Sequence, residues 1–185
     1  MKKKVFPSLE SIEKNYKEEF YGEKTEFPKV SDNLEWLENN HRLYVKGHTD
    51  KIKSIAISHN NKYVVSGGED NTIIIWDLQQ KRQEAVLKGH TSYVNSVAIT
   101  NDNKYIVSCG GNIFNKNPDN TIRIWNFQQK RQEAVLKGHK SPVNSVVITH
   151  DNKSIVSGGD DKAVRVWNFQ EKHQEAVLKG HTSLV

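Results

Sequence analysis

A block of about 42 residues recurs along this chain and constrains its fold more than any other feature. Each copy opens on Gly-His, and the openings lie at residues 47, 89, 138 and 180. The segment QQKRQEAVLKGH at 79–90 returns unchanged at 128–139 and with two changes at 170–181. A unit of this length buries its apolar face only against a neighbouring unit, so we expect the copies to form one continuous array.

The pattern inside each copy is typical of β-strands. Apolar and polar residues alternate, and β-branched residues are frequent. In the first copy the predicted strands cover 52–58, 62–66, 72–77 and 83–87. Residues that favour tight turns separate them, at His59-Asn60-Asn61, Gly67-Gly68 and Gln79-Gln80-Lys81. Four short, closely connected strands per copy predict an all-β fold of four-stranded antiparallel sheets.

Residues 1–41 do not share the repeat and form a separate N-terminal segment, which precedes a repeat region over 42–185. Ser8 is a candidate N-cap, and the apolar residues after it fall on one helical face: Leu9, Ile12, Tyr16 and Phe20. A second short helix is predicted after Ser31, carrying Leu34, Trp36 and Leu37. Such a segment either packs onto the repeats or docks on a partner, and both alternatives stay open.

Composition excludes several classes of protein. The mean hydropathy is −0.74, and no apolar run approaches the roughly 20 residues that cross a bilayer. The first ten residues, MKKKVFPSLE, lack the apolar stretch of a secretory signal. The single cysteine, Cys109, cannot form an intrachain disulfide, so we expect a reducing compartment and a cytoplasmic protein. The repeat region carries a net charge of +7 and residues 1–41 carry −2.

The spacing of Gly-His, Ser-x-Gly and Asp-x-Thr-x-x-x-Trp-Asp closely resembles the WD-repeat family of β-propellers. The resemblance covers residues 42–185 and implies three complete four-stranded blades in an incomplete ring. In this family His, Ser, Asp and Trp form a buried hydrogen-bonded tetrad. Matched residue by residue, the structural tetrads are His48, Ser66, Asp70 and Trp76; His90, Ser108, Asp119 and Trp125; His139, Ser157, Asp161 and Trp167. The closing Asp of the signature is kept at Asp77 and becomes Asn126 and Asn168.

The same residue types argue against catalysis. Ser, His and Asp together suggest a nucleophilic triad, but the set occurs three times in one register, and a hydrolase needs one site with an exposed nucleophile. The histidines lack metal-ligand spacing, and no Gly-rich loop precedes a helix. Gly110-Gly111 and its counterparts lie between predicted strands and are interpreted as turns. We therefore predict no catalytic residue, no metal and no cofactor.

The ring that the resemblance implies is not complete. Residues 42–46 (RLYVK) align with the last strand of a repeat (EAVLK) and fit the strand that closes a propeller. A fourth copy has only begun at residue 180, and three blades fall below the four to eight of known propellers. We expect either a piece of a longer propeller or a pair of chains that closes a six-bladed ring.

The resemblance implies a rigid platform that binds proteins or peptides without chemistry. In nearly identical repeats the informative positions are those that differ, such as the third residue after Gly-His: Lys51, Tyr93, Pro142 and Leu184. By analogy this position begins the innermost strand on the top face, where partners dock. Neutral drift at exposed positions would give the same pattern.

The second copy holds seven more residues than the others between its tetrad Ser and Asp, around Asn112-Ile113-Phe114-Asn115-Lys116-Asn117. An exposed Phe beside a Tyr and a Lys has the composition of an interface hot spot. The alternative is a tolerated insertion whose Phe folds over the neighbouring blade. The predicted partner-binding residues are therefore Lys51, Tyr93, Pro142, Ile113, Phe114 and Lys116.

The sequence leaves two other functions open. Basic pairs recur on equivalent turns, at Lys81-Arg82, Lys130-Arg131 and Lys172-His173, and could form an arc for nucleic acid or another acidic partner. Base-stacking aromatics are not interleaved with this arc, so nucleic acid is less favoured. The remaining alternative is a truncated product of a larger propeller gene without independent function.

Overall fold

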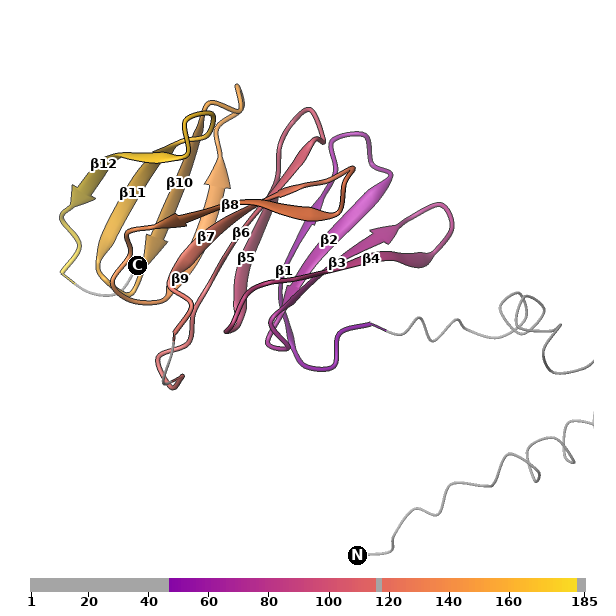
Figure 1. Ribbon diagram of the computed structural model, residues 1–185, viewed down its shortest axis with the longest axis horizontal. Helices are drawn as coiled ribbons and strands as arrows, with labels where there is room; N and C mark the ends of the chain where they lie inside the picture. Colours follow the sequence, from indigo (N-terminus) through magenta and orange to yellow (C-terminus); the bar gives the residue numbers. More distant parts are fainter. Residues whose placement is uncertain (1–46, 116–117, 183–185) are drawn as a thin grey trace, which may run out of the picture. The chain divides into compact units, whose positions relative to one another are not determined.

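The computed structural model describes residues 47–115 and 118–182, and this part of the chain folds entirely into strands and turns (Figure 1). The strands, in chain order, are β1 (Ile52–Ile57), β2 (Tyr63–Gly68), β3 (Thr72–Asp77), β4 (Arg82–Lys88), β5 (Val94–Ile99), β6 (Tyr105–Gly110), β7 (Thr121–Asn126), β8 (Arg131–Lys137), β9 (Val143–Ile148), β10 (Ser154–Gly159), β11 (Ala163–Asn168) and β12 (His173–Lys179). The predicted N-terminal helices, Trp36 and the candidate closing strand at 42–46 lie outside the described residues.

The strands form three antiparallel sheets, each with its strands in sequence order: β1–β4, β5–β8 and β9–β12. We call these sheets blade 1, blade 2 and blade 3. The prediction of four-stranded antiparallel blades is confirmed. Tight turns link the strands, and an Asn in the left-handed region closes each first turn: Asn61, Asn103 and Asn152, with φ of 56 to 58°. Asn adopts this conformation at lower cost than most residues, which is why these turns recur.

The prediction that Gly67-Gly68 forms a turn is wrong. Both glycines lie inside β2, and the turn follows them. A Cβ on Gly67 would lie 2.5 Å from Val94 Cγ1 of blade 2, and a Cβ on Gly68 would lie 2.7 Å from His48 Nδ1. Gly110 likewise belongs to β6 and not to a turn. Gly67 and Gly68 are needed for the close approach of neighbouring side chains, and Gly110 for that of the Tyr93 backbone, and not for chain reversal.

The first strand of each blade lies nearest the next blade's first strand. β1 contacts β5, and β5 contacts β9, whereas β4, β8 and β12 are the outer strands of their sheets. The inner strands therefore bring the residues that begin β1, β5 and β9 close to one another.

The hydrophobic cores lie between the blades. One core joins Val65, Ile73, Ile75 and Leu87 of blade 1 to Val94, Val97, Ile106, Trp125 and Phe127 of blade 2. The second joins the equivalent residues of blades 2 and 3: Val107, Cys109, Ile122, Ile124 and Leu136 with Val143, Val146, Ile155 and Trp167. Each blade thus buries its apolar face against its neighbour, as expected for a repeat array.

Polar contacts between blades repeat in the same register. Ser54 Oγ accepts a hydrogen bond from the Val97 amide at 3.1 Å, and Ser96 Oγ accepts one from the Val146 amide at 3.3 Å. The backbone amide of His59 donates to Asn103 Oδ1 at 2.6 Å, and that of Asn101 donates to Asn152 Oδ1 at 2.9 Å. The two interfaces between blades are therefore built alike.

Within the described ranges no helix is long and apolar enough to cross a membrane.

Candidate functional site

The predicted tetrad residues lie together in every blade as a chain of hydrogen bonds. In blade 2 the indole N–H of Trp125 donates to Ser108 Oγ at 2.8 Å, and the serine hydroxyl donates to His90 Nε2 at 2.7 Å. His90 Nδ1–H then donates to Asp119 Oδ2 at 2.8 Å. The same three distances are 2.8, 2.8 and 3.0 Å for Trp76, Ser66, His48 and Asp70, and 2.9, 2.8 and 2.9 Å for Trp167, Ser157, His139 and Asp161.

Burial and hydrogen bonding shift the pKa values of the histidine and aspartate in the tetrads of blades 2 and 3. Burial lowers the pKa of His90, and the hydrogen bond to Asp119 offsets this only in part. Burial alone would raise the pKa of Asp119, but hydrogen bonds from His90, Thr121 and the Thr91 amide hold that pKa well below its usual range. His139 and Asp161 show lowered pKa values for the same reasons. A neutral imidazole beside an ionised carboxylate is the arrangement that the hydrogen-bond chain requires.

The tetrads have the atoms of a catalytic triad but not its access. Ser66, Ser108 and Ser157 are at most 2% exposed, and each hydroxyl oxygen already accepts the indole N–H. A nucleophilic serine needs an approach path for the substrate, and burial leaves none. The tetrads tie the segment before each first strand to the second and third strands, which is a structural role. Among the described residues, no group of three or more His, Cys, Asp or Glu side chains could hold a metal ion.

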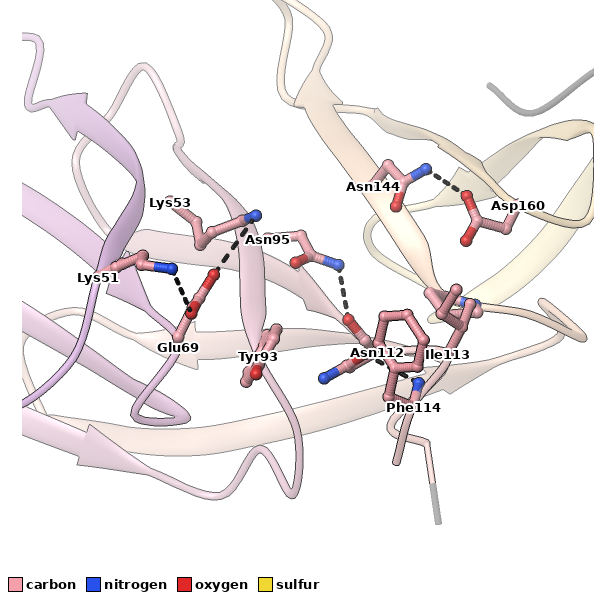
Figure 2. A pocket seen from close by; sticks show the side chains of 12 residues that line it. Lys51, Lys53, Glu69, Tyr93, Asn95, Asn112, Ile113, Phe114, Asn144 and Asp160 are labelled. Carbon is pink, nitrogen blue, oxygen red and sulfur yellow. Dashed lines mark hydrogen bonds and ion pairs between the residues drawn. The ribbon is translucent and has the colours of Figure 1, made fainter. Parts of the chain in front are cut away.

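A cavity of about 380 Å³ opens where the inner strands of the three blades begin (Figure 2). Nine of its lining residues come from three positions that recur in each blade. The third residue after Gly-His gives Lys51, Tyr93 and Pro142, and the fifth gives Lys53, Asn95 and Asn144. The residue that directly follows the second strand of each blade gives Glu69, Gly111 and Asp160. The insertion in blade 2 adds Asn112, Ile113 and Phe114.

Backbone hydrogen bonds hold the lining positions in equivalent places. The carbonyls of Lys51, Tyr93 and Pro142 accept from the amides of Glu69, Gly111 and Asp160, at 2.8, 3.0 and 2.9 Å. The frame of the cavity is therefore the same in all three blades, although the side chains on it differ. The lining side chains can therefore differ between blades while the backbone geometry stays the same.

The wall differs in charge from one blade to the next. In blade 1, Lys53 Nζ lies 3.7 Å from Glu69 Oε1 and Lys51 Nζ lies 4.0 Å from Glu69 Oε2, as Figure 2 shows. In blade 2, the Asn95 amide donates to the carbonyls of Gly111 and Val143 at 2.9 and 3.0 Å, which links blades 2 and 3. In blade 3, the Asn144 side chain donates to Asp160 Oδ1 at 2.7 Å. The cavity wall is therefore charged at blades 1 and 3 and carries a neutral amide at blade 2.

The insertion presents an apolar pair to solvent at the cavity. Ile113 is 65% exposed and Phe114 is 87% exposed. Asn112 Oδ1 accepts the Phe114 amide at 2.9 Å, and the Asn115 side chain donates to the Thr91 carbonyl at 3.2 Å. These bonds anchor the start of the loop to blade 2. The alternative in which Phe114 folds over the neighbouring blade is wrong, because so exposed a ring packs against little of the protein.

The predicted partner-binding residues differ in how far they are exposed at the cavity. Lys51 is exposed, Tyr93 is half-buried, and Pro142 is buried in the cavity wall. Lys116 and Leu184 lie outside the described residues. Sequence reasoning missed several lining residues: Lys53, Glu69, Asn95, Asn144 and Asp160. A signal for the fifth position existed, because residues two apart on a strand face the same side.

The lysines of the predicted basic arc make contacts between blades. Lys130 Nζ lies 3.0 Å from Glu84 Oε1 of blade 1 and 4.2 Å from the centre of the Phe127 ring. Lys172 Nζ lies 4.2 Å from the Phe169 ring centre and 5.6 Å from that of Tyr105 in blade 2. Burial also lowers the pKa of Lys172. Two of the three basic turns therefore direct their lysine toward the preceding blade.

These blades, stacked through their faces and each held by a His-Ser-Asp-Trp tetrad, are those of a β-propeller. The chain belongs to the WD40 repeat family, whose model, described as "WD domain, G-beta repeat", matches residues 40–77, 81–126 and 130–168. The predicted resemblance is confirmed.

Solved structures share this fold. The chain is 27% identical to the RRP9 WD40 repeats and 26% identical to U3-55K, each with a TM-score of 0.70 and over 76% of this chain. It spans 42% and 43% of the length of those two chains.

Curated relatives share a shorter stretch. A ribosome biogenesis protein BOP1 homolog of Aedes aegypti is 42% identical over 40 residues, which is 22% of this chain and 5% of that protein. WD repeat-containing protein 90 of Xenopus tropicalis is 33% identical over 46 residues, 25% of this chain and 2% of that protein. The shared region is about the size of one repeat, so the match concerns the repeat itself.

Proposed function

We propose that this chain is a non-catalytic scaffold that binds a protein or peptide partner at the cavity between the inner strands. One observation carries the proposal: the cavity is lined by positions at which otherwise matching repeats differ, and the only long insertion among the repeats borders it. The tetrads and the contacts between blades supply a rigid frame on which this wall is displayed.

The chemistry of the wall favours a protein partner. Ile113 and Phe114 offer an exposed apolar anchor beside the half-buried ring of Tyr93. Aromatic and apolar anchors surrounded by polar groups are typical of the centre of protein interfaces. Lys51 and Lys53 supply charged groups at the blade 1 side, where they would select the partner more than add affinity.

A phosphate-rich partner is less well supported. Lys130 and Lys172 are engaged between blades, and Lys130 is already paired with Glu84. Nucleic-acid binding through phosphates would weaken steeply as salt rises. Filter binding of single-stranded RNA and of duplex DNA across a salt series separates the two functions, and we expect weak retention that does not distinguish the wild-type chain from a Lys81→Ala, Arg82→Ala variant.

The proposal is tested by site-specific photo-crosslinking in native lysate. A photoreactive residue at position 51, which is exposed at the cavity, should capture a discrete protein, and the same residue at position 59 should not. His59 is exposed and follows the opposite end of β1 from Lys51, so it serves as the matched control.

A second variant, Ile113→Ser with Phe114→Ser, should abolish capture while the melting temperature stays unchanged. Capture that is equal from both positions, or that survives the double substitution, would contradict binding at the cavity.

We also propose that the chain acts in the cytoplasm. Cys109 is the only cysteine of the sequence, so no disulfide forms within it, as is usual for proteins of a reducing compartment. Fluorescence microscopy of the tagged full chain tests this. Accumulation in the nucleus would contradict it.

A further inference from the structure

The two ends of the described array present complementary halves of one interface. The cores, the hydrogen bonds to Ser and Asn side chains, and the aromatic pairs between blades 1 and 2 all recur between blades 2 and 3. Each blade therefore has a leading face, turned toward the blade before it, and a following face, turned toward the blade after it. We propose that the following face of blade 3 binds the leading face of blade 1 in a second copy of this chain, through the contacts that join the blades inside the chain.

The apolar halves of this interface are exposed only at the two ends. Leu87 and Leu136 are 2% and 3% exposed where the next blade covers them, but their equivalent Leu178 in blade 3 is 55% exposed. Val97 and Val146 are 5% and 3% exposed, but their equivalent in blade 1, Ile55, is 69% exposed. Both ends therefore carry the residue types of the internal cores without the cover that those cores have.

The remaining core positions at the two ends also carry residues equivalent to those of the internal cores. The face that blade 1 offers to blade 2, Val65, Ile73, Ile75 and Leu87, recurs in blade 3 as Val156, Val164, Val166 and Leu178. The face that blade 2 offers to blade 1, Val94, Val97, Ile106 and Trp125, recurs in blade 1 as Ile52, Ile55, Val64 and Trp76. Joining the ends would form a third core of the same composition.

The hydrogen-bonding groups are also complementary. Ser54 Oγ accepts the Val97 amide, and the equivalent pair across the ends is Ser145 Oγ and the Ile55 amide. The His59 amide donates to Asn103, and the equivalent pair is the His150 amide and Asn61 Oδ1. Each donor at one end thus meets an acceptor at the other.

Charge is complementary as well. Lys130 Nζ pairs with Glu84 at 3.0 Å between blades 1 and 2. The equivalents at the ends are Lys81 on blade 1 and Glu175 on blade 3, and both are exposed. Docking the ends would pair them as the internal residues are paired.

At each end of the array, one residue differs from its equivalents in the other blades, and these two residues would face each other if the ends paired. Between blades an aromatic pair recurs, with ring centroids 5.1 Å apart for Tyr63 and Phe127 and 5.3 Å apart for Tyr105 and Phe169. Blade 1 has Leu78 where the later blades have Phe, and blade 3 has Ser154 where the earlier blades have Tyr. Both members of the aromatic pair are therefore replaced, and neither end is left with one ring of the pair and no ring opposite it. An interface without this pair is weaker than the internal ones, and its formation depends on concentration.

Such a contact is heterologous, because different faces of the two copies meet. Two copies of the described three-blade array, joined at both junctions, would bring six blades into one ring, within the four to eight at which propellers close. The starts of the inner strands would then surround one central opening. The inference is independent of which partner the cavity binds.

The oligomeric mass of the full chain, measured by sedimentation velocity over a concentration series, tests the proposal. We expect a dimer that dissociates on dilution. Ile55→Glu and Leu178→Glu should each give a monomer with unchanged far-ultraviolet circular dichroism, and Phe114→Glu, which places a charge at an exposed apolar residue away from the ends, should leave the dimer intact.

Mixing the two monomeric variants makes the test specific. The Leu178→Glu copy keeps a competent blade 1 and the Ile55→Glu copy keeps a competent blade 3, so the mixture should form a one-to-one complex through a single junction. Likewise Lys81→Glu should raise the dissociation constant severalfold, and adding Glu175→Lys should restore it.

A wild-type monomer at every concentration would overturn the proposal and indicate that another segment covers the ends. A dimer that both glutamate variants leave unchanged would also overturn it, since association would then use another surface. Failure of the two variants to complement each other would exclude head-to-tail pairing.

Discussion

Trp125 joins the inside of its own blade to the face of the blade before it. Its indole N–H donates to Ser108 Oγ at 2.8 Å, while its ring packs in the core shared with blade 1. The tetrad and the interface between blades are therefore connected through one side chain. Substitutions in either should affect the whole array.

The first prediction concerns tryptophans at equivalent positions. Trp125→Ala should lower the free energy of unfolding by about 3–5 kcal/mol, because it removes a buried ring from a core between two blades. Trp76→Ala should cost less, since Trp76 is only partly buried and no described blade precedes it. Urea denaturation of both variants measures the difference, and equal losses would contradict the ordering.

The second prediction concerns the tetrad serines. Ser66→Ala, Ser108→Ala and Ser157→Ala should each destabilise the fold by about 1–3 kcal/mol, because two hydrogen-bonding partners lose the hydroxyl that joins them. The wild-type chain should not react with a fluorophosphonate probe for activated serines. Labelling of one of the three serines would show that it acts as a nucleophile, contrary to the structural role.

The third prediction is a loss of stability in mild acid. The pKa values of His90 and His139 are lowered in the folded chain from the ordinary 6.5, so the unfolded chain binds more protons below about pH 6.5. Stability should therefore be full above that pH and fall as the pH drops, by at most about 1.4 kcal/mol per pH unit for each histidine. The lowered pKa values of the tetrad aspartates act in the same direction below their ordinary value of 3.8.

Urea midpoints between pH 7.5 and 5.5 measure this slope. His90→Gln, which removes a buried imidazole, should reduce it. Stability that stays constant or rises over this range would contradict the neutral state of the buried imidazoles.

The fourth prediction concerns the insertion of blade 2. Deleting residues 112–118 should preserve the fold, because the frame hydrogen bond from Gly111 to Tyr93 lies outside the deleted stretch and blades 1 and 3 have no such loop. The deletion removes Ile113 and Phe114, and partner capture should fall with them. Circular dichroism and pull-down of the captured partner measure the two effects, and undiminished capture by a folded deletion variant would leave the loop without a binding role.

The repeat is enough to predict the fold, because the apolar–polar alternation of a strand and the pairing of consecutive strands depend on residues close together in the sequence. Alternation over six residues predicts a strand, and four strands with short connections admit an antiparallel sheet. The end of β2 was missed because Gly67 and Gly68 have the composition of a turn, while their actual requirement comes from Val94 and His48, distant in the sequence. A glycine pattern alone does not separate these two causes.

The site was predicted only in part. Lys51 and Tyr93 were found because they differ between repeats, whereas Glu69 reaches the cavity through the pairing of β1 with β2, which places Gly68 opposite Ile52. The basic arc was predicted from Lys81, Lys130 and Lys172 on equivalent turns. Lys130 and Lys172 lie near a tyrosine ring of the preceding blade, and Lys130 also pairs with Glu84 of that blade. A single repeat contains no information on its neighbour.

The location of both cores between blades also sets how the array opens. Blade 2 contributes to both cores, whereas blades 1 and 3 each contribute to one. In a linear array of this kind the end units fray while the middle unit opens only when its neighbours have left it. In the monomer, amide hydrogens of β6 and β7 should consequently exchange with solvent more slowly than their equivalents in β2, β3, β10 and β11, so a structure made of nearly equal repeats would show unequal protection along its length.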